Sequence, residues 1–125
     1  MIDSTPRRDI QGRAFMFACA ILPLCDRLLR RGGVAALLAR QLAKAGTSIG
    51  ANMAEATAAQ TKPDFIAKAC IARKEAFESQ YWLRLLESTF RPVPAEVASL
   101  RDEASQIVAI LTKIVSVARS SPRRG

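Results

Sequence analysis

Hydrophobic residues recur along this chain at intervals of three and four, which is the spacing of one face of an α-helix. The pattern holds over four segments, at about residues 8–31, 34–60, 62–90 and 95–119. Helix-breaking residues separate them, and Thr61 is placed to cap the third helix. Because the helices are similar in length and the connections are short, the sequence predicts an all-α fold, an up-down-up-down antiparallel four-helix bundle in one domain. Residues 120–125 form a basic tail.

The second helix contains two glycines, Gly46 and Gly50, in a row of small residues beside its apolar row. A glycine inside a helix costs about 1 kcal/mol relative to alanine. Close approach of a second helix is the usual reason for tolerating this cost, because a glycine lets two backbones pack nearer than side chains allow. Small residues also fill the first half of the third helix, so we expect that helix to lie against the glycine row.

Several large apolar residues lie off the four core-facing rows. They are Phe15, Leu22, Leu29 and Trp82. A single four-helix core would leave them exposed to solvent, and exposed apolar surface of this extent is typical of an interface. The sequence therefore predicts that the bundle self-associates.

The chain is strongly basic, with 19 Lys and Arg against 11 Asp and Glu, a formal net charge of +8. Such a charge favours an acidic partner such as RNA or DNA, with a well-solvated surface as the alternative. The predicted topology gathers arginines at the two ends of the bundle. With the lysines beside them, one end has Arg7, Arg8, Arg13, Lys62, Lys68, Arg119, Arg123 and Arg124, and the other has Arg27, Arg30, Arg31, Arg91 and Arg101. The residues predicted to bind nucleic acid are Arg7, Arg8, Arg13, Arg27, Arg30, Arg31, Arg119, Arg123 and Arg124. Because aromatic residues are few, we expect contacts with phosphates and little sequence choice.

The chain has no histidine, which excludes a Ser-His-Asp triad, a Cys-His pair and any His-ligated metal site. Glu75 and Glu78 form one acidic pair, but no matching pair is predicted on a facing helix for a magnesium site. We therefore expect no catalytic residue, no metal and no cofactor. The three cysteines lack a paired spacing and are expected to be reduced core residues.

An apolar run follows Arg7 and Arg8 and resembles a signal peptide. Arg13 directly precedes the run, and the helical pattern continues past it, which favours a helix of the folded domain. The run is also too short to span a bilayer. We expect a cytoplasmic protein that does not insert into a membrane.

Two segments resemble a known family. They are ARQLAKAGTSIGANMAEA, residues 39–56, and DFIAKACIARKEAFESQYWLRLL, residues 64–86. With the motifs GTSIGAN-x-AEA and KEA-x-E-x-x-YWL-x-LL, the chain resembles the bacterial "four helix bundle protein" family over about residues 8–119. That family includes the protein encoded in intervening sequences of 23S ribosomal RNA genes and the accessory protein of diversity-generating retroelements.

The resemblance implies a ring-like homopentamer. It implies nucleic-acid binding through basic surface and contact with a reverse transcriptase, as in the retroelement accessory proteins. The alternative is an intervening-sequence-encoded or stand-alone structural oligomer with an unknown partner. Within the family motif, Ser48, Asn52 and Glu55 are polar members of an apolar helix that also holds Gly46 and Gly50. The resemblance implies that they hydrogen-bond to a neighbouring helix and serve packing, with ligand binding as the alternative.

Overall fold

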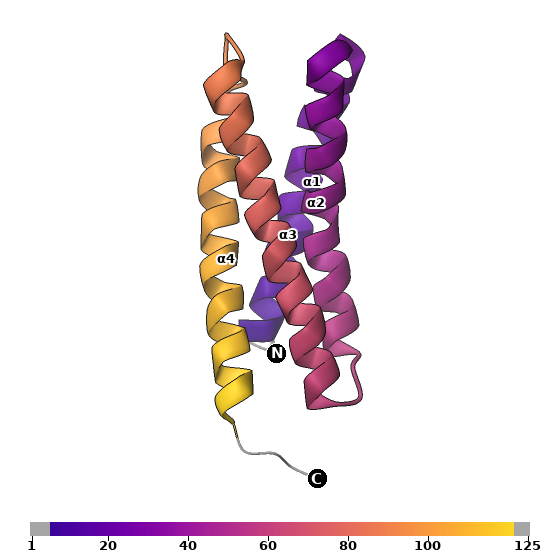
Figure 1. The fold of residues 1–125 in the computed structure, drawn as a ribbon, viewed down its shortest axis with the longest axis vertical. Helices are drawn as coiled ribbons and strands as arrows, with labels where there is room; N and C mark the ends of the chain where they lie inside the picture. Colours follow the sequence, from indigo (N-terminus) through magenta and orange to yellow (C-terminus); the bar gives the residue numbers. More distant parts are fainter. Residues whose placement is uncertain (1–5, 122–125) are drawn as a thin grey trace.

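The structure, a computed structural model, describes residues 6–121 and the side chains of residues 9–121. It contains four helices in this part of the chain: α1 (Pro6–Arg31), α2 (Gly33–Thr57), α3 (Lys62–Thr89) and α4 (Val97–Ser120). Each helix runs antiparallel to the one before it, so α1 and α3 point in the same direction (Figure 1). The prediction of an all-α bundle with four helices is confirmed.

The helices form a ring of neighbours in chain order. α2 packs against α1 and α3, α3 packs also against α4, and α1 and α4 share the smallest interface. Within the described residues, α1 and α3 form no interface, because they lie diagonally across the bundle. In Figure 1, α3 crosses the near side of the molecule and α1 lies on the far side.

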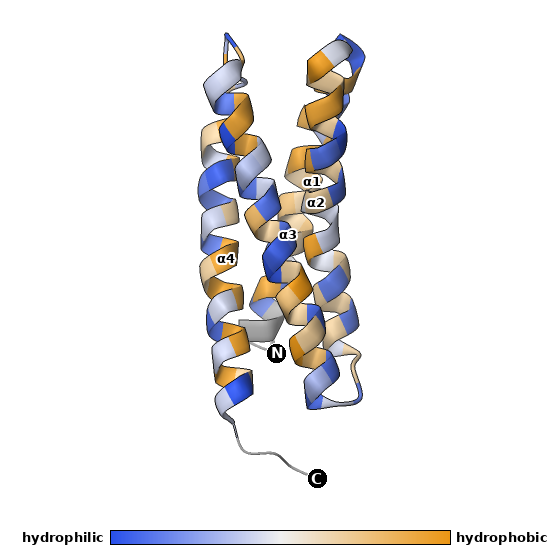
Figure 2. Ribbon diagram, in the orientation of Figure 1, coloured by the Kyte–Doolittle hydropathy of each residue, from blue (hydrophilic) through white to orange (hydrophobic). Residues whose placement is uncertain are grey.

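The centre of the bundle is filled by the apolar rows of all four helices. Phe17, Leu42, Met53, Leu83 and Leu111 are fully buried or nearly so. Burying one such side chain contributes about 1.5–3 kcal/mol. Figure 2 shows hydrophilic and hydrophobic residues interspersed on the outward surface of α3 and α4, as expected for helices with only one face in a core.

The helix ends differ from the sequence prediction by up to three residues. α2 ends at Thr57 rather than at residue 60, because the chain turns after Ala58 towards the cap of α3. There the Thr61 hydroxyl accepts a hydrogen bond from the Asp64 amide at 3.2 Å, which confirms the predicted cap. α4 begins at Val97 rather than at residue 95, since the Val97 amide closes a turn on the Pro94 carbonyl.

The turn between α1 and α2 is very tight. α1 ends at Arg31 and α2 begins at Gly33, so Gly32 is the one residue between them. Gly32 and Gly33 have φ angles of +77° and +58°. These are left-handed conformations, which glycine adopts without the steric cost that a side chain would add.

The glycine row of α2 faces α1. A Cβ placed on Gly46 would lie 2.0 Å from Ile21 Cδ1, and one on Gly50 would lie 3.6 Å from Ala14 Cβ and 3.7 Å from the Ala14 carbonyl carbon. The prediction that α3 lies against the glycines is therefore wrong. Small residues show where a helix can be approached closely, but α1 also offers a small residue, Ala14, and the sequence pattern does not distinguish the two neighbours.

Gly50→Leu is expected to destabilise the bundle by about 1–3 kcal/mol, because a large side chain there must displace the backbone of Ala14. Gly50→Ala is expected to be neutral or to stabilise by up to about 1 kcal/mol, since its Cβ makes an ordinary contact and alanine favours a helix. Thermal unfolding followed by circular dichroism measures both. Gly12→Leu is the control, because Gly12 has nothing within 4 Å of its Cβ position. An unchanged melting temperature for Gly50→Leu would contradict this packing.

Candidate self-association and nucleic-acid surfaces

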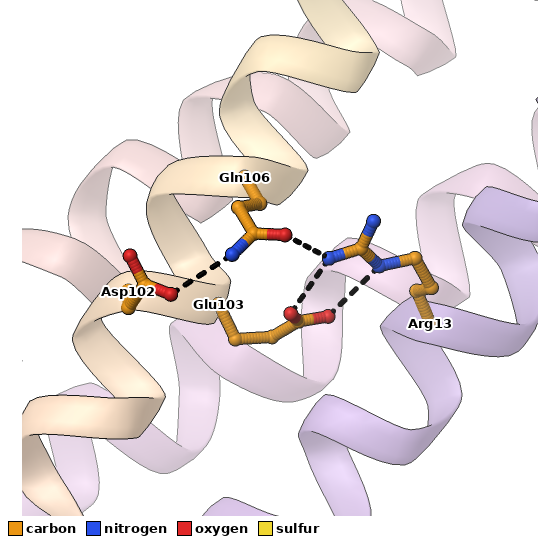
Figure 3. A network of polar contacts seen from close by, with 4 residues as sticks. All are labelled: Arg13, Asp102, Glu103 and Gln106. Atoms are coloured by element: carbon orange, nitrogen blue, oxygen red, sulfur yellow. Dashed lines mark hydrogen bonds and ion pairs between the residues drawn. The ribbon is translucent and has the colours of Figure 1, made fainter.

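Arg13 joins α1 to α4 through a forked ion pair. Its Nε donates to Glu103 Oε2 at 3.0 Å, and its Nη2 donates to Glu103 Oε1 and to Gln106 Oε1, each at 2.7 Å (Figure 3). The Gln106 amide donates in turn to Asp102 Oδ2 at 2.8 Å. The hydrogen bond to Glu103 raises the pKa of Arg13. A bidentate pair of this kind is strong and directional, so Arg13 serves to hold the smallest helix interface together.

The arginines at the opposite end of the bundle also have partners within the chain. Arg27 pairs with Glu96, which lowers the pKa of that carboxyl, and Arg30 pairs with Asp26 at 2.8 Å. The Arg31 guanidinium lies 5.0 Å from the centroid of the Phe90 ring, a cation–π contact. Exposed ion pairs are worth little, so Arg27 and Arg30 can exchange their carboxylates for a phosphate.

The remaining arginines predicted to bind nucleic acid lie near the chain ends. Arg119 donates from Nη2 to Cys70 Sγ at 3.5 Å. The side chains of Arg7, Arg8, Arg123 and Arg124 lie outside the described residues. The structure therefore brings Arg13, Arg27, Arg30, Arg31 and Arg119 into intramolecular contacts and does not gather them into one patch.

Sequence reasoning missed a set of cations on the sides of the bundle. Arg40 and Lys44 on α2, Lys74 and Arg84 on α3, and Lys113 on α4 form no ion pair within the described part of the chain. Lys44 and Lys74 both lie near Glu75, where they oppose the rise in its pKa that partial burial and Glu78 produce. For Arg40, Lys44 and Lys113, the signal that could have found them is the absence of an acidic residue three or four positions away. Lys74 and Arg84 each have a glutamate at such a position, so the sequence gives no signal for them.

The outward face of α1 is apolar. Phe15 is 66% exposed and Met16 is 65% exposed, and Leu22 and Leu29 continue the same face. Cys19 and Pro23 are exposed between them, and no charged residue occurs from Ala14 to Cys25. The exposed Asp26 lies on the same face, between Leu22 and Leu29. We call this surface the α1 apolar face. Apolar surface of this length on a folded domain marks an interaction site.

A second apolar surface lies on α3, as an open hollow of about 610 Å³. Its lining consists of Cys70, Arg73, Lys74, Phe77, Glu78, Tyr81 and Trp82. Phe77 and Tyr81 are about half exposed. The rings of Tyr81 and Trp82 meet edge to face, with centroids 5.2 Å apart. Trp82 is only partly exposed, and its buried Nε1 has no hydrogen-bond partner within the described structure. We call this surface the α3 hollow.

The polar residues of the family motif on α2 form mostly local contacts. Ser48 donates to the Lys44 carbonyl at 2.7 Å, and Asn52 donates to the Ser48 carbonyl at 2.8 Å. The expectation that these two bond to a neighbouring helix is wrong, because short polar side chains in a helix bond readily to the carbonyl one turn back. Glu55 does reach a neighbour, since it pairs with Lys68 of α3 at 3.0 Å.

Neither the thiols nor the carboxylates gather into a recognisable reactive centre. Cys25 is buried, Cys70 is partly exposed and Cys19 is exposed, so the expectation of three core cysteines holds only for Cys25. Burial raises the pKa of the Cys25 thiol to about 11. Over residues 9–121, no group of three or more acidic or thiol side chains is placed to hold a metal ion. In the same region, no helix has the length and apolar character needed to cross a membrane.

These features define an α-helical bundle with uncovered apolar faces. Residues 8–113 match the family described as 23S rRNA-intervening sequence protein, and the chain belongs to that family. It is also similar to a crystal structure from Bacteroides thetaiotaomicron, titled a protein with unknown function from the S23 ribosomal protein family. The two share 33% identity with a TM-score of 0.81, over 90% of this chain and 99% of the other. No curated protein matches the chain.

Removal of the Arg13–Glu103 pair is expected to weaken the bundle. A double-mutant cycle of Arg13→Met and Glu103→Gln is expected to give a coupling free energy of about 0.5–1 kcal/mol in urea unfolding, because the pair is forked and two-thirds buried. The same cycle on Arg30 and Asp26, an exposed pair within one helix, is the control and is expected to give less. Equal coupling for the two pairs would contradict the role of Arg13 in fastening α1 to α4.

Proposed function

We propose that the protein is a non-enzymatic homo-oligomeric scaffold of the cytoplasm that binds nucleic acid through its basic surface. The observation that carries the proposal is the α1 apolar face, which has large exposed side chains and no charged residue from Ala14 to Cys25. Burial of such a face against another protein surface removes apolar area from water, at about 25 cal/mol per Å². A scaffold that assembles through this face leaves its charged sides free for a partner.

The subunit number that we propose is five. It rests on the resemblance to retroelement accessory proteins, in which the subunits form a ring. A ring repeats each basic group of the subunit around its axis, so contacts that are weak singly add up in binding a long polyanion. The lateral cations Arg40, Lys44 and Arg84 lie outside the α3 hollow and form no ion pair within the described residues, so they have no carboxylate to release before they contact a phosphate.

Native mass spectrometry at micromolar concentration is expected to show a homo-oligomer, with the pentamer as the main species. The physical reason is the apolar surface of α1, which a monomer leaves in water. Lys113→Ala, which changes an exposed residue outside both apolar surfaces, is a control expected to leave the mass of the assembly unchanged. A single peak at the monomer mass would exclude the ring and the multivalent binding that depends on it.

Binding to RNA and DNA is expected to tolerate changes of sequence and to fall steeply as salt rises, because binding to phosphates releases counterions. Arg123→Ala with Arg124→Ala is expected to weaken binding equally across sequences and to reduce the salt slope by about 1 for each arginine–phosphate pair that the substitutions remove. Gel-shift titrations at low and physiological salt measure both effects. The matched control is Arg123→Lys with Arg124→Lys, which keeps the charge and is expected to preserve the slope.

The partner that we propose beyond nucleic acid is a reverse transcriptase, as in the retroelement accessory proteins. The gene neighbourhood tests this directly, since a nearby reverse transcriptase gene with template and variable repeats is expected. The second candidate is a structural oligomer encoded in an intervening sequence and without a nucleic-acid role, and the match to the 23S rRNA-intervening sequence family favours it. A gene located within a ribosomal RNA gene, together with no binding at low salt, would establish the second candidate.

A further inference from the structure

The α1 apolar face and the α3 hollow lie on different sides of the bundle. Phe15, Met16, Leu22 and Leu29 point away from the core on α1, and Phe77 and Tyr81 do so on α3. The two helices are diagonal neighbours that form no interface within the described residues, and Figure 1 shows them on the far and near sides. One copy of the chain therefore cannot cover either surface with the other.

The two surfaces lie at the same level along the bundle. Phe17 and Ile21 of α1 pack at Gly46 of α2. Glu55 of α2 pairs with Lys68 of α3 at 3.0 Å. Because α2 and α3 are antiparallel (Figure 1), Gly46, nine residues before Glu55, is level with the stretch of α3 about nine residues after Lys68, which is the middle of the hollow. α1 and α3 also point in the same direction (Figure 1).

We propose that the α1 apolar face of one copy packs into the α3 hollow of the next copy. This inference rests on the self-association in the proposed function and names the surfaces that form it. A contact between two different surfaces is heterologous, so each copy offers one of each and the assembly continues from copy to copy. Because the surfaces are level and their helices parallel, copies related by rotation about an axis along the bundle join without a shift along it. Such an assembly closes into a ring when the rotation per copy is a whole fraction of a turn.

The apolar parts of the two surfaces are similar in length. The hollow spans residues 70–82, about 18 Å of helix, and the charge-free part of the α1 face spans residues 15–25, about 15 Å, with the exposed Asp26 following it. The charged residues Arg73, Lys74 and Glu78 also line the hollow. Met16 and Cys19 supply sulfur atoms, which pack well against aromatic edges such as those of Phe77, Tyr81 and Trp82. Nucleic acid suits the α1 face poorly as an occupant, since that face has no cation between Ala14 and Cys25 to meet a phosphate.

A contact between two α1 faces is the main alternative within self-association. Such a contact is isologous and ends at a dimer. It would leave Phe77 and Tyr81 exposed in the hollow. The heterologous contact covers both apolar surfaces with one type of interface, which is the physical reason for preferring it.

Two single variants and their mixture test the proposal. Phe15→Asp is expected to disable the α1 face and leave the hollow intact, whereas Phe77→Asp is expected to disable the hollow and leave the α1 face intact. Each variant alone is expected to run as a monomer. An equimolar mixture is expected to form a dimer of one copy of each and nothing larger, because one intact junction remains. Native mass spectrometry measures the masses and the composition.

Each other result overturns the proposal in a distinguishable way. If Phe77→Asp keeps the wild-type mass, the hollow is not an interface, although self-association stands. If both variants are monomers and the mixture forms no dimer, the two surfaces do not join each other. If the wild-type chain is itself a monomer, the self-association of the proposed function fails as well.

Folding controls accompany the experiment. Phe15 and Phe77 are both exposed in the subunit, so each aspartate is expected to preserve the helical circular dichroism spectrum. Should an aspartate variant lose that spectrum, Met16→Lys replaces Phe15→Asp and Tyr81→Lys replaces Phe77→Asp, with the same expected masses. Val34→Asp introduces the same charge at an equally exposed apolar residue of α2 outside both surfaces, and it is expected to keep the wild-type mass.

Discussion

The close contact between α1 and α2 determines the arrangement of the rest of the bundle. Gly46 lets Ile21 approach the α2 backbone more closely than a side chain would permit, and Gly50 lies against Ala14 with room for no more than a methyl group. α1 therefore presents one narrow face to α2 and the core, and its other apolar residues point outward. The apolar face that drives the proposed assembly is the side of α1 turned away from α2 and α4, the two helices that α1 contacts within the described residues.

Electrostatic contacts strengthen the interface between α1 and α4, where apolar packing is least extensive. α1 and α4 share the smallest interface, and Arg13 of α1 joins them through its forked pair with Glu103. The pair of Arg27 with Glu96 is more exposed and contributes less. The cations that remain without a carboxylate are on the sides of α2 and α3. In a chain with a formal charge of +8, arginine therefore has two roles. Arg13 joins two helices, and arginines such as Arg40 and Arg84 leave positive charge on the surface.

Much of the fold could be predicted from the sequence. The contacts of the candidate surface residues could be predicted much less well. The spacing of apolar residues located all four helices, and the off-row positions of Phe15, Leu22 and Leu29 predicted their exposure. The neighbour of the glycine row could not be predicted, because Ala14 and the alanines of α3 are equally small. The partners of Arg13 and Arg27 depend on how far two helices diverge, which no local pattern encodes. Asn52 was misassigned since a bond within its own helix competes with any bond to a neighbour.

The turn at Gly32 limits the length of the connection between α1 and α2. One residue separates α1 from α2, and both Gly32 and Gly33 have positive φ angles. A residue inserted here that joined α2 as a helical residue would rotate the rest of α2 by about 100° around its own axis relative to α1. Ala45 and Ile49 would then take the places of Gly46 and Gly50 opposite Ile21 and Ala14. The length of this connection therefore helps to keep the two glycines directed at α1.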